Sequence, residues 1–348
     1  MTDKVVKIDG SYGEGGGQIL RTAIALSCVT GVAVEVDKIR ANRPRPGLAM
    51  QHMKGIEAAK LMSSAEVEGL RKGSTRVLFK PGKVRGGKFR VDIGTAGSIS
   101  LVLQVLIPIA MSADRESEIT VTGGTDVKWS PPVDYLKNVT LKAVERMGGR
   151  ADVEVVRRGY YPEGGGRVTA VIEPSGLHAV EFEVVRRARV KGISHCSNLP
   201  RHVAERQAKS AAERLSEGKA ECSVELDGVD VEIEVSRGKS TGSGITLWCD
   251  SPVGGSALGE KGKRAEIVGR EAAEALLRGL KAEAAVDEWA GDQLMVFAAL
   301  AKGVTRYTVS RVTKHQISNA YVINKFFDGC VKIDEDRKFI AVKGAGIL

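Results

Sequence analysis

A histidine near the carboxyl end lies between two different patterns in the segment TVSRVTKHQISNAYVINKFF. Residues 306–314 before it are rich in β-branched types and predict a strand. After it, Ser318 or Asn319 can cap a helix whose apolar residues recur at helical spacing. His315 is therefore expected at a strand-to-helix turn, where outward backbone N–H groups and the helix dipole favour an anion.

A glycine-rich segment near the amino end, GSYGEGGGQILRTA, has related chemistry. Its glycines allow a ligand to approach the backbone closely, and a helical pattern follows at once. Glu14 projects from this loop, and Arg21 falls on the first turn or so of the helix. A carboxylate beside an anion-binding helix start is suited to a divalent metal held between it and a polyphosphate. The alternative is a glycine-rich turn with a surface glutamate.

The segment RANRPRPGLAMQH adds a cluster of positive charge. Arg40, Arg43 and Arg45 lie within six residues, and guanidinium groups suit bidentate contacts with phosphate. Gln51 and His52 follow directly and favour a polar pocket. A solvated basic loop is the alternative.

Other polar residues are less specific. Asp292 and Gln293 stand at the head of the apolar helix pattern DEWAGDQLMVFAAL, where a helix cap is favoured slightly over an active-site edge. His195, Cys196 and His202 have a spacing that fits no familiar zinc pattern and indicate structural roles. Neither a P-loop nor a GxGxxG motif is complete, so a nucleotide site would be of another type.

The composition limits the class of partner. The net charge of +9 over 348 residues indicates an anion, such as nucleic acid, a nucleotide or a phosphorylated metabolite. Aromatic residues make up only 5%, which argues against an extensive base-stacking platform. The start of the chain lacks a hydrophobic signal, and the most apolar run, residues 99–113, is too short to span a bilayer. We therefore expect a cytoplasmic protein with no membrane contact, whose five scattered cysteines are free.

Strand and helix patterns alternate along the chain, which predicts an α/β protein of repeated βαβ-type units. Apolar periodicity predicts helices that begin near Gln18, Met50, Ser98 and Pro132. The glycine runs at 13–17 and 164–166 resemble each other and indicate a duplicated unit that reuses its glycine turn, unless the likeness is due to chance. Residues 183–285 contain a complete small α/β pattern, with two strands in AECSVELDG and VDVEIEVSRG. We interpret them as a domain inserted into a larger one made of 1–182 and 286–348.

Taken together, these segments resemble the RNA 3′-terminal phosphate cyclase family. The likeness runs in order through most of the chain and is carried by DGSYGEGGGQILRTA, RPRPGLAMQH, DIGTAGS with SLVLQ, GGTDVKWSPPVDY, LPRHVAERQ, WAGDQL and TKHQISNAYVIN. The resemblance implies a large domain of three repeated α/β units with an inserted small α/β domain. It also implies an ATP-dependent enzyme that converts the 3′-phosphate of an RNA into a 2′,3′-cyclic phosphodiester.

The resemblance assigns roles residue by residue. His315 would attack the α-phosphorus of ATP, giving a covalent histidine–AMP and then an RNA–adenylate. We expect the helix start to lower its pKa and keep it neutral. Glu14 would be the carboxylate next to a divalent metal, Mg²⁺ or Mn²⁺. The phosphates and the RNA end would be bound by Arg21, Arg40, Arg43, Gln51 and His52. The nucleotide would contact Gln104, Pro131, Asp292, Gln293 and Trp289, the last of which stands where some relatives have a tyrosine.

Three other functions remain open on the residues alone. A branch of the same superfamily lacks the histidine and serves in ribosomal RNA maturation, but His315 is present here. Enolpyruvyl transferases share the repeated architecture and bind phosphorylated anions without ATP. A basic RNA-binding scaffold would need no catalytic histidine. The sequence is compatible with a homo-oligomer as well as with a monomer.

Overall fold

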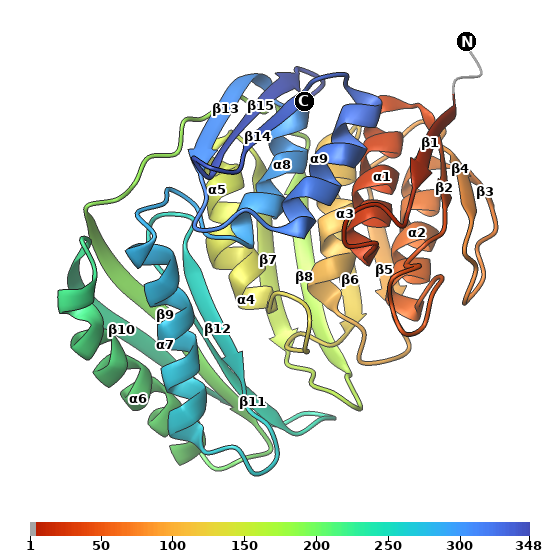
Figure 1. The fold of residues 1–348 in the computed structure, drawn as a ribbon. Helices are drawn as coiled ribbons and strands as arrows, with labels where there is room; N and C mark the ends of the chain where they lie inside the picture. Colours follow the sequence, from red (N-terminus) through yellow and green to blue (C-terminus); the bar gives the residue numbers. More distant parts are fainter. Residues whose placement is uncertain (1–4) are drawn as a thin grey trace.

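A computed structural model describes residues 5–348, in which helices and strands alternate along the chain (Figure 1). The predicted α/β class is confirmed. Helices begin close to the predicted starts at Gln18, Met50, Ser98 and Pro132. Within the described residues, no helix combines the length and the apolar character needed to cross a membrane.

The first group of elements is a four-stranded sheet with two helices. Its strands lie in the order β1 (Val5–Asp9), β2 (Ala33–Asp37), β4 (Val77–Lys80) and β3 (Glu66–Glu68). Strands β1 and β2 are parallel, because helix α1 (Gly17–Thr30) carries the chain back between them. Helix α2 (Met50–Ser63) follows β2.

The second group repeats this order. Its strands are β5 (Lys88–Asp92), β6 (Ser117–Gly123), β8 (Gly166–Glu173) and β7 (Arg150–Arg157). Helix α3 (Ile99–Met111) joins the parallel pair β5 and β6. The second helical stretch consists of α4 (Val133–Tyr135), a π-helical turn η1 (Leu136–Thr140) and α5 (Leu141–Arg146).

A third group has the same order once a short extended segment is included. Residues 178–181 pair in parallel with β13, which is followed in the sheet by β15 and β14. The elements of this group are α8 (Ala290–Leu300), β13 (Lys302–Thr308), α9 (Lys314–Phe326), β14 (Val331–Asp334) and β15 (Phe339–Ala345). A long segment therefore interrupts the group between its first strand and its first helix.

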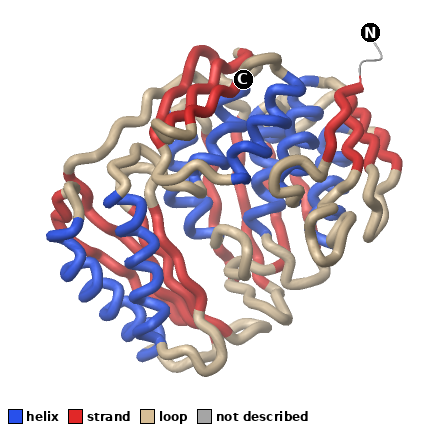
Figure 2. Tube along the Cα trace, in the orientation of Figure 1, coloured by secondary structure: helices blue, strands red, loops and turns tan. Residues whose placement is uncertain are grey.

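That long segment forms a body with its own core. Its sheet has the order β10 (Glu225–Ser236), β9 (Arg187–Ser197), β11 (Gly242–Trp248) and β12 (Gly254–Leu258). Helices α6 (His202–Gly218) and α7 (Ala265–Lys281), with the short turn η2 (Lys219–Glu221) after α6, complete it. Both helices lie on one face of the sheet (Figure 2). Val190, Leu215, Leu247 and Leu276 belong to a buried cluster separate from the main core. The boundaries 1–182, 183–285 and 286–348 are compatible with this arrangement and stay a prediction.

Two expectations about these elements are wrong. The two glycine runs do not occupy equivalent places, since residues 13–17 connect β1 to α1 whereas 164–166 lead from β7 into β8. The loop equivalent to 13–17 in the second group is 93–98, between β5 and α3. The two strands expected in AECSVELDG and VDVEIEVSRG are one strand, β10, which absorbs Asp227 and Gly228 in a bulge against β9.

Candidate active site

His315 lies inside a helix rather than before one. Helix α9 begins at Lys314, so His315 is its second residue, and the predicted start at Ser318 or Asn319 is wrong. The helix is capped by Thr313, whose Oγ1 accepts from the backbone N–H of Gln316 at 3.2 Å. The Gln316 side chain accepts in return from the Thr313 N–H at 2.9 Å, which completes a capping box. Strand β13 covers Lys302–Thr308, so the strand predicted over 306–314 is placed too far toward the carboxyl end.

Each ring nitrogen of His315 faces a carboxylate. Nδ1 lies 3.1 Å from Oδ2 of Asp292, and Nε2 lies 2.7 Å from Oε2 of Glu14. Burial lowers the pKa of His315, but the hydrogen bond and charge of Asp292 and the charge of Glu14 outweigh it, so the pKa is raised above its ordinary value. The expected lowering by the helix start is therefore wrong: the two carboxylates dominate.

Glu14 is held by the first and the third group together. The preceding glycine, Gly13, has φ +60° and leaves room for the side chain of Ser318, which a Cβ at Gly13 would approach to 2.5 Å. Ser318 Oγ accepts from the Glu14 backbone N–H at 3.3 Å. The Glu14 carboxylate also forms an ion pair with Arg43. Glu14 thus contacts Arg43, from the loop 40–47 (the arginine loop), as well as His315.

The arginines differ in their surroundings. Arg40 donates from Nη1 to the carbonyl oxygen of Gly47 at 2.8 Å, which closes the arginine loop. Arg43 is half-buried, whereas Arg45 is exposed. Burial lowers the pKa of Arg21 to about 10, partly offset by the charge of Asp292, so Arg21 is still a cation at neutral pH.

Gln51 and His52 stand at the start of α2. His52 is 8% exposed, and burial together with the charges of Arg21 and Arg40 lowers its pKa to about 3. His52 is therefore neutral and would act on a phosphate only through hydrogen bonds. Its Nε2 faces Gly17 so closely that a Cβ there would lie 2.2 Å away. Gln51 Oε1 accepts from the backbone N–H of Ser98 at 3.0 Å, which joins α2 to the start of α3.

A second set of predicted residues surrounds a small cavity beside His315. This cavity is lined by Arg21, Gln104, Asp292 and Gln293 among others. Gln104 Nε2 donates to Gln293 Oε1 at 3.0 Å, and Thr140 Oγ1 donates to the same oxygen at 2.9 Å.

The two remaining nucleotide-contact candidates, Trp289 and Pro131, do not line this cavity. Trp289 is 42% exposed, and its ring meets Tyr135 edge to face with centroids 6.4 Å apart. Gln293 Nε2 donates to the Trp289 carbonyl oxygen at 3.1 Å. The Pro131 carbonyl accepts from Ser100 Oγ at 2.6 Å, and within residues 5–348 no hydrogen bond joins Pro131 to the residues around His315.

Asp292 was expected to cap α8 and does not. The carboxylate of Asp287 accepts from the backbone N–H groups of Trp289 and Ala290 at 2.9 and 2.8 Å, so it has the capping role. Burial raises the pKa of Asp287 to about 6. Asp287 was not predicted from the sequence, although an aspartate just before a helix is a start signal. Asp292 is left to contact His315.

Two further residues that were not predicted as site residues, Asn319 and Gln18, lie next to the site. Asn319 donates from Nδ2 to the Asp292 carbonyl oxygen at 3.3 Å and accepts from Thr22 Oγ1 at 2.8 Å. Gln18 is buried, and its Nε2 has no partner among the described residues. Only the position of Gln18 beside the glycine run could have indicated it.

Most of the candidate residues lie near the first turns of helices α1, α2, α8 and α9, whereas Gln104 lies within α3 and Pro131 precedes α4. No side chain caps α1 or α2, whose N-cap residues are Gly16 and Ala49. Free N–H groups, the helix dipoles and the cations Arg21 and Arg43 favour an anion here. Glu14 supplies an oxygen that suits Mg²⁺ or Mn²⁺, but the neighbouring side chains form no closed cage, so phosphate oxygens would have to complete a metal site.

The fold and this site define an α/β protein of repeated units with a histidine beside helix starts and arginines that favour an anion. A model of the family "RNA 3′-terminal phosphate cyclase" matches residues 12–333. The chain belongs to that family.

Several curated relatives are similar over nearly their whole length. The RNA 3′-terminal phosphate cyclase of Archaeoglobus fulgidus is 58% identical over 338 residues, covering 97% of this chain and 100% of the relative. The protein of that name from Pyrococcus furiosus is 49% identical, with coverage of 98% and 97%. Among solved structures, the enolpyruvyl transferase NikO from Streptomyces tendae aligns with a TM-score of 0.41 and 9% identity, over 99% of this chain and 49% of that one.

Proposed function

We propose that this protein uses ATP to convert the 3′-terminal phosphate of an RNA into a 2′,3′-cyclic phosphodiester. The observation that carries the proposal is the position of His315 in the first turn of α9, with Asp292 on Nδ1 and Glu14 on Nε2. Membership of the cyclase family supports it.

His315 is the proposed nucleophile through Nε2. Asp292 fixes the ring by accepting from Nδ1–H, which leaves Nε2 as the nitrogen that faces the ligand. Because the two carboxylates raise the pKa, Nε2 must lose a proton and its contact with Glu14 before it can attack. Glu14, 2.7 Å away, is placed to receive that proton.

The proposed reaction has three steps. Nε2 of His315 forms a bond to the α-phosphorus of ATP, and the bond from that phosphorus to pyrophosphate breaks. An oxygen of the RNA 3′-phosphate then attacks the same phosphorus and releases the histidine, giving an RNA–adenylate. Finally the vicinal 2′-hydroxyl attacks the RNA phosphorus, loses its proton to water and expels AMP. The last step is aided by proximity, because both groups belong to one ribose, and it requires RNA rather than DNA.

The other candidates have positioning roles in this proposal. Arg21, Arg40 and Arg43 contact phosphate oxygens, and Gln51 with neutral His52 completes the pocket for the RNA end. The exposed face of Trp289 packs against adenine, with Gln104, Gln293 and Pro131 beside the nucleotide. A divalent ion held by Glu14 and phosphate oxygens would neutralise charge on the phosphates.

The test follows label from ATP. The protein is incubated with Mg²⁺ and ATP labelled at the α-phosphate, denatured, and examined for an acid-labile, alkali-stable adduct. We expect label on the wild type and on His202→Ala, a control at an exposed histidine of α6, and none on His315→Ala. Label that persists in His315→Ala would place the nucleophile elsewhere. Cyclisation of 3′-phosphorylated RNA, assayed on the same three proteins, must follow the same pattern.

A further inference from the structure

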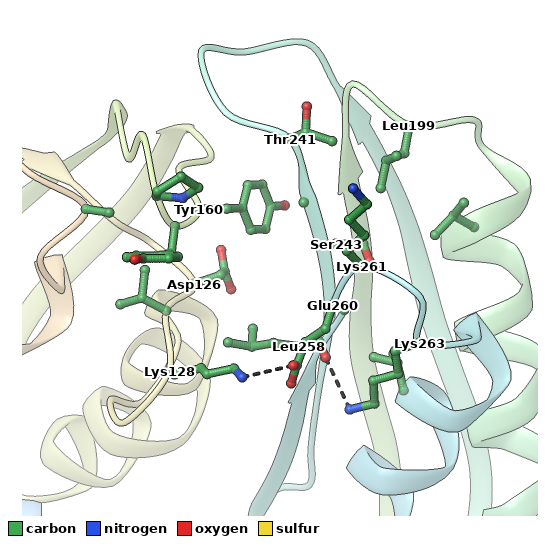
Figure 3. Close-up of a pocket in the computed structure, with 18 of the residues that line it drawn as sticks. Asp126, Lys128, Tyr160, Leu199, Thr241, Ser243, Leu258, Glu260, Lys261 and Lys263 are labelled. Atoms are coloured by element: carbon green, nitrogen blue, oxygen red, sulfur yellow. Dashed lines mark hydrogen bonds and ion pairs between the residues drawn. The ribbon is translucent and has the colours of Figure 1, made fainter.

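A large cleft separates the inserted body from the second group of elements. Its volume is about 1110 Å³, above the roughly 300–1,000 Å³ typical of small-molecule sites. In Figure 3, Asp126, Lys128 and Tyr160 stand on one side, and Leu258, Glu260 and Lys263 on the other. The space therefore suits a segment of a polymer better than a single small ligand.

The cleft borders the candidate active site. A second small cavity, different from the one beside His315, is lined by Arg21 and His52. Gln51 and Leu101 line both this second cavity and the cleft. A chain whose phosphorylated end lies at Arg21 and His52 would pass Gln51 and enter the cleft. This step rests on the proposed function, which places the RNA end there.

The walls of the cleft are basic. Five cations line it, against the carboxylates of Glu163, Glu260 and the buried Asp126. These cations are Lys128, Arg206, Lys261, Lys263 and Arg264. Lys128 pairs with Glu260 across the cleft at 2.9 Å, and three other cations pair with Glu266 or Glu271 of α7. Three of them belong to the loop between β12 and α7, which has the sequence GEKGKR. Exposed Lys261 forms no ion pair with any of residues 5–348, so it is available for a phosphate.

Trp129 gives the cleft an exposed aromatic surface. Its side chain is 97% exposed, and its backbone is in the left-handed region, with φ +66°. A tryptophan is rarely exposed to this extent without a partner, and a positive φ is uncommon for a bulky residue. Tyr161, 78% exposed, lines the same cleft. Cations beside exposed aromatic rings are the features with which proteins bind single-stranded nucleic acid.

We propose that this cleft binds the nucleotides that precede the 3′-terminal phosphate of the RNA, with Trp129 stacking on a base and the loop 259–264 contacting the backbone. The inserted body then acts as one wall of the substrate channel. Because Trp129 and Tyr161 are the two exposed aromatic rings that line it, the cleft is expected to bind the charged backbone of a continuous strand with little preference for base sequence.

The test measures binding without ATP, so that it does not depend on catalysis. Anisotropy of labelled, 3′-phosphorylated RNA of about two and about twelve nucleotides gives Kd for each length. Wild-type protein is expected to bind the longer RNA more tightly. Trp129→Ala should weaken binding of the longer RNA roughly tenfold and leave that of the shorter one unchanged. Lys261→Ala should lower the salt dependence for the longer RNA by about one phosphate contact.

Matched controls are Leu61→Ala, an exposed apolar residue of α2, and Lys332→Ala on β14, neither of which lines the cleft. Trp129→Gly, which accommodates the positive φ without strain, separates loss of the ring from a distorted loop. Wild-type affinity of both Trp129 variants for the longer RNA would overturn the proposal, as would equal losses for both lengths. Failure of the proposed function would appear separately, as unlabelled wild-type protein whose RNA binding still depends on length and on Trp129.

Discussion

At the scale of single residues, the site depends on where the protons of His315 are. Asp292 and Glu14 face its two ring nitrogens, and Arg21 is the cation near it. The pKa raised by the carboxylates means that the protein without ligand holds an imidazolium more firmly than a free histidine does. The same ion pairs that order the ring must be broken before Nε2 can act as a nucleophile.

Removing the charge of Asp292 should therefore lower the pKa of His315. We expect NMR titration of the protein free of metal and nucleotide to place the wild-type midpoint above about 6.5 and that of Asp292→Asn below the wild-type value. The His315→Ala spectrum assigns the resonance. Because the folded-state pKa exceeds the unfolded one, the stabilisation by these pairs is complete below about pH 6.5 and is lost as pH rises through the folded-state pKa. A wild-type midpoint at or below the ordinary value would contradict this account.

At the scale of elements, the start of α9 fixes the histidine. The capping box of Thr313 and Gln316 satisfies N–H groups of the first turn. It also sets the direction in which the side chain of His315 projects from the helix. Thr313→Ala should lower the free energy of unfolding by about 1 kcal/mol and slow adduct formation, whereas Thr313→Ser, which keeps the hydroxyl, should restore both. Chemical denaturation and the α-phosphate label give the two readouts. Full adduct formation by Thr313→Ala would show that the cap does not position the ring.

Element types were predictable from the sequence, but their ends were less so. Apolar periodicity indicated α1, α2 and α3 correctly, since it reflects burial of one helix face. The β-branched residues before His315 favoured a strand, and the T-x-x-Q pattern of a capping box at Thr313 was the stronger signal. The two glycine runs look alike because glycine permits many turns, so the same letters serve unrelated connections.

The clustering of the candidate site followed from family resemblance rather than from spacing. His315 and Glu14 are about 300 residues apart in sequence, and only the packing of α9 against α1 brings them together. The protonation of the site was mispredicted for the same reason. The dipole of α9 is a local feature that the sequence indicates, whereas the carboxylates of Glu14 and Asp292 arrive from other elements.

At the scale of the whole molecule, one buried arginine joins the inserted body to the rest. Arg158 forms ion pairs with Asp126 and Asp134 of the second group and with Glu234 of β10. His195 of β9 lies beside this cluster, with Nδ1 2.8 Å from the hydroxyl of Tyr160. Asp126, Asp134 and His195 could present three atoms to a metal, but Arg158 already forms ion pairs with both aspartates. None of these partners is near Arg158 in sequence, apart from the neighbouring Tyr160, so the junction was not predictable.

Loss of Arg158 should loosen this junction and with it the cleft. Arg158→Met keeps much of the volume but leaves buried carboxylates without a counter-charge, so we expect the free energy of unfolding to fall by about 3–5 kcal/mol. The control is Arg187→Met, whose partner Glu225 is equally exposed, and its cost should be about 0–1 kcal/mol. Denaturant unfolding followed by circular dichroism measures both. If the two variants were equally stable, the buried cluster would not hold the inserted body.

Since that body forms one wall of the proposed RNA channel, Arg158→Met should also weaken binding of the longer RNA more than that of the shorter one.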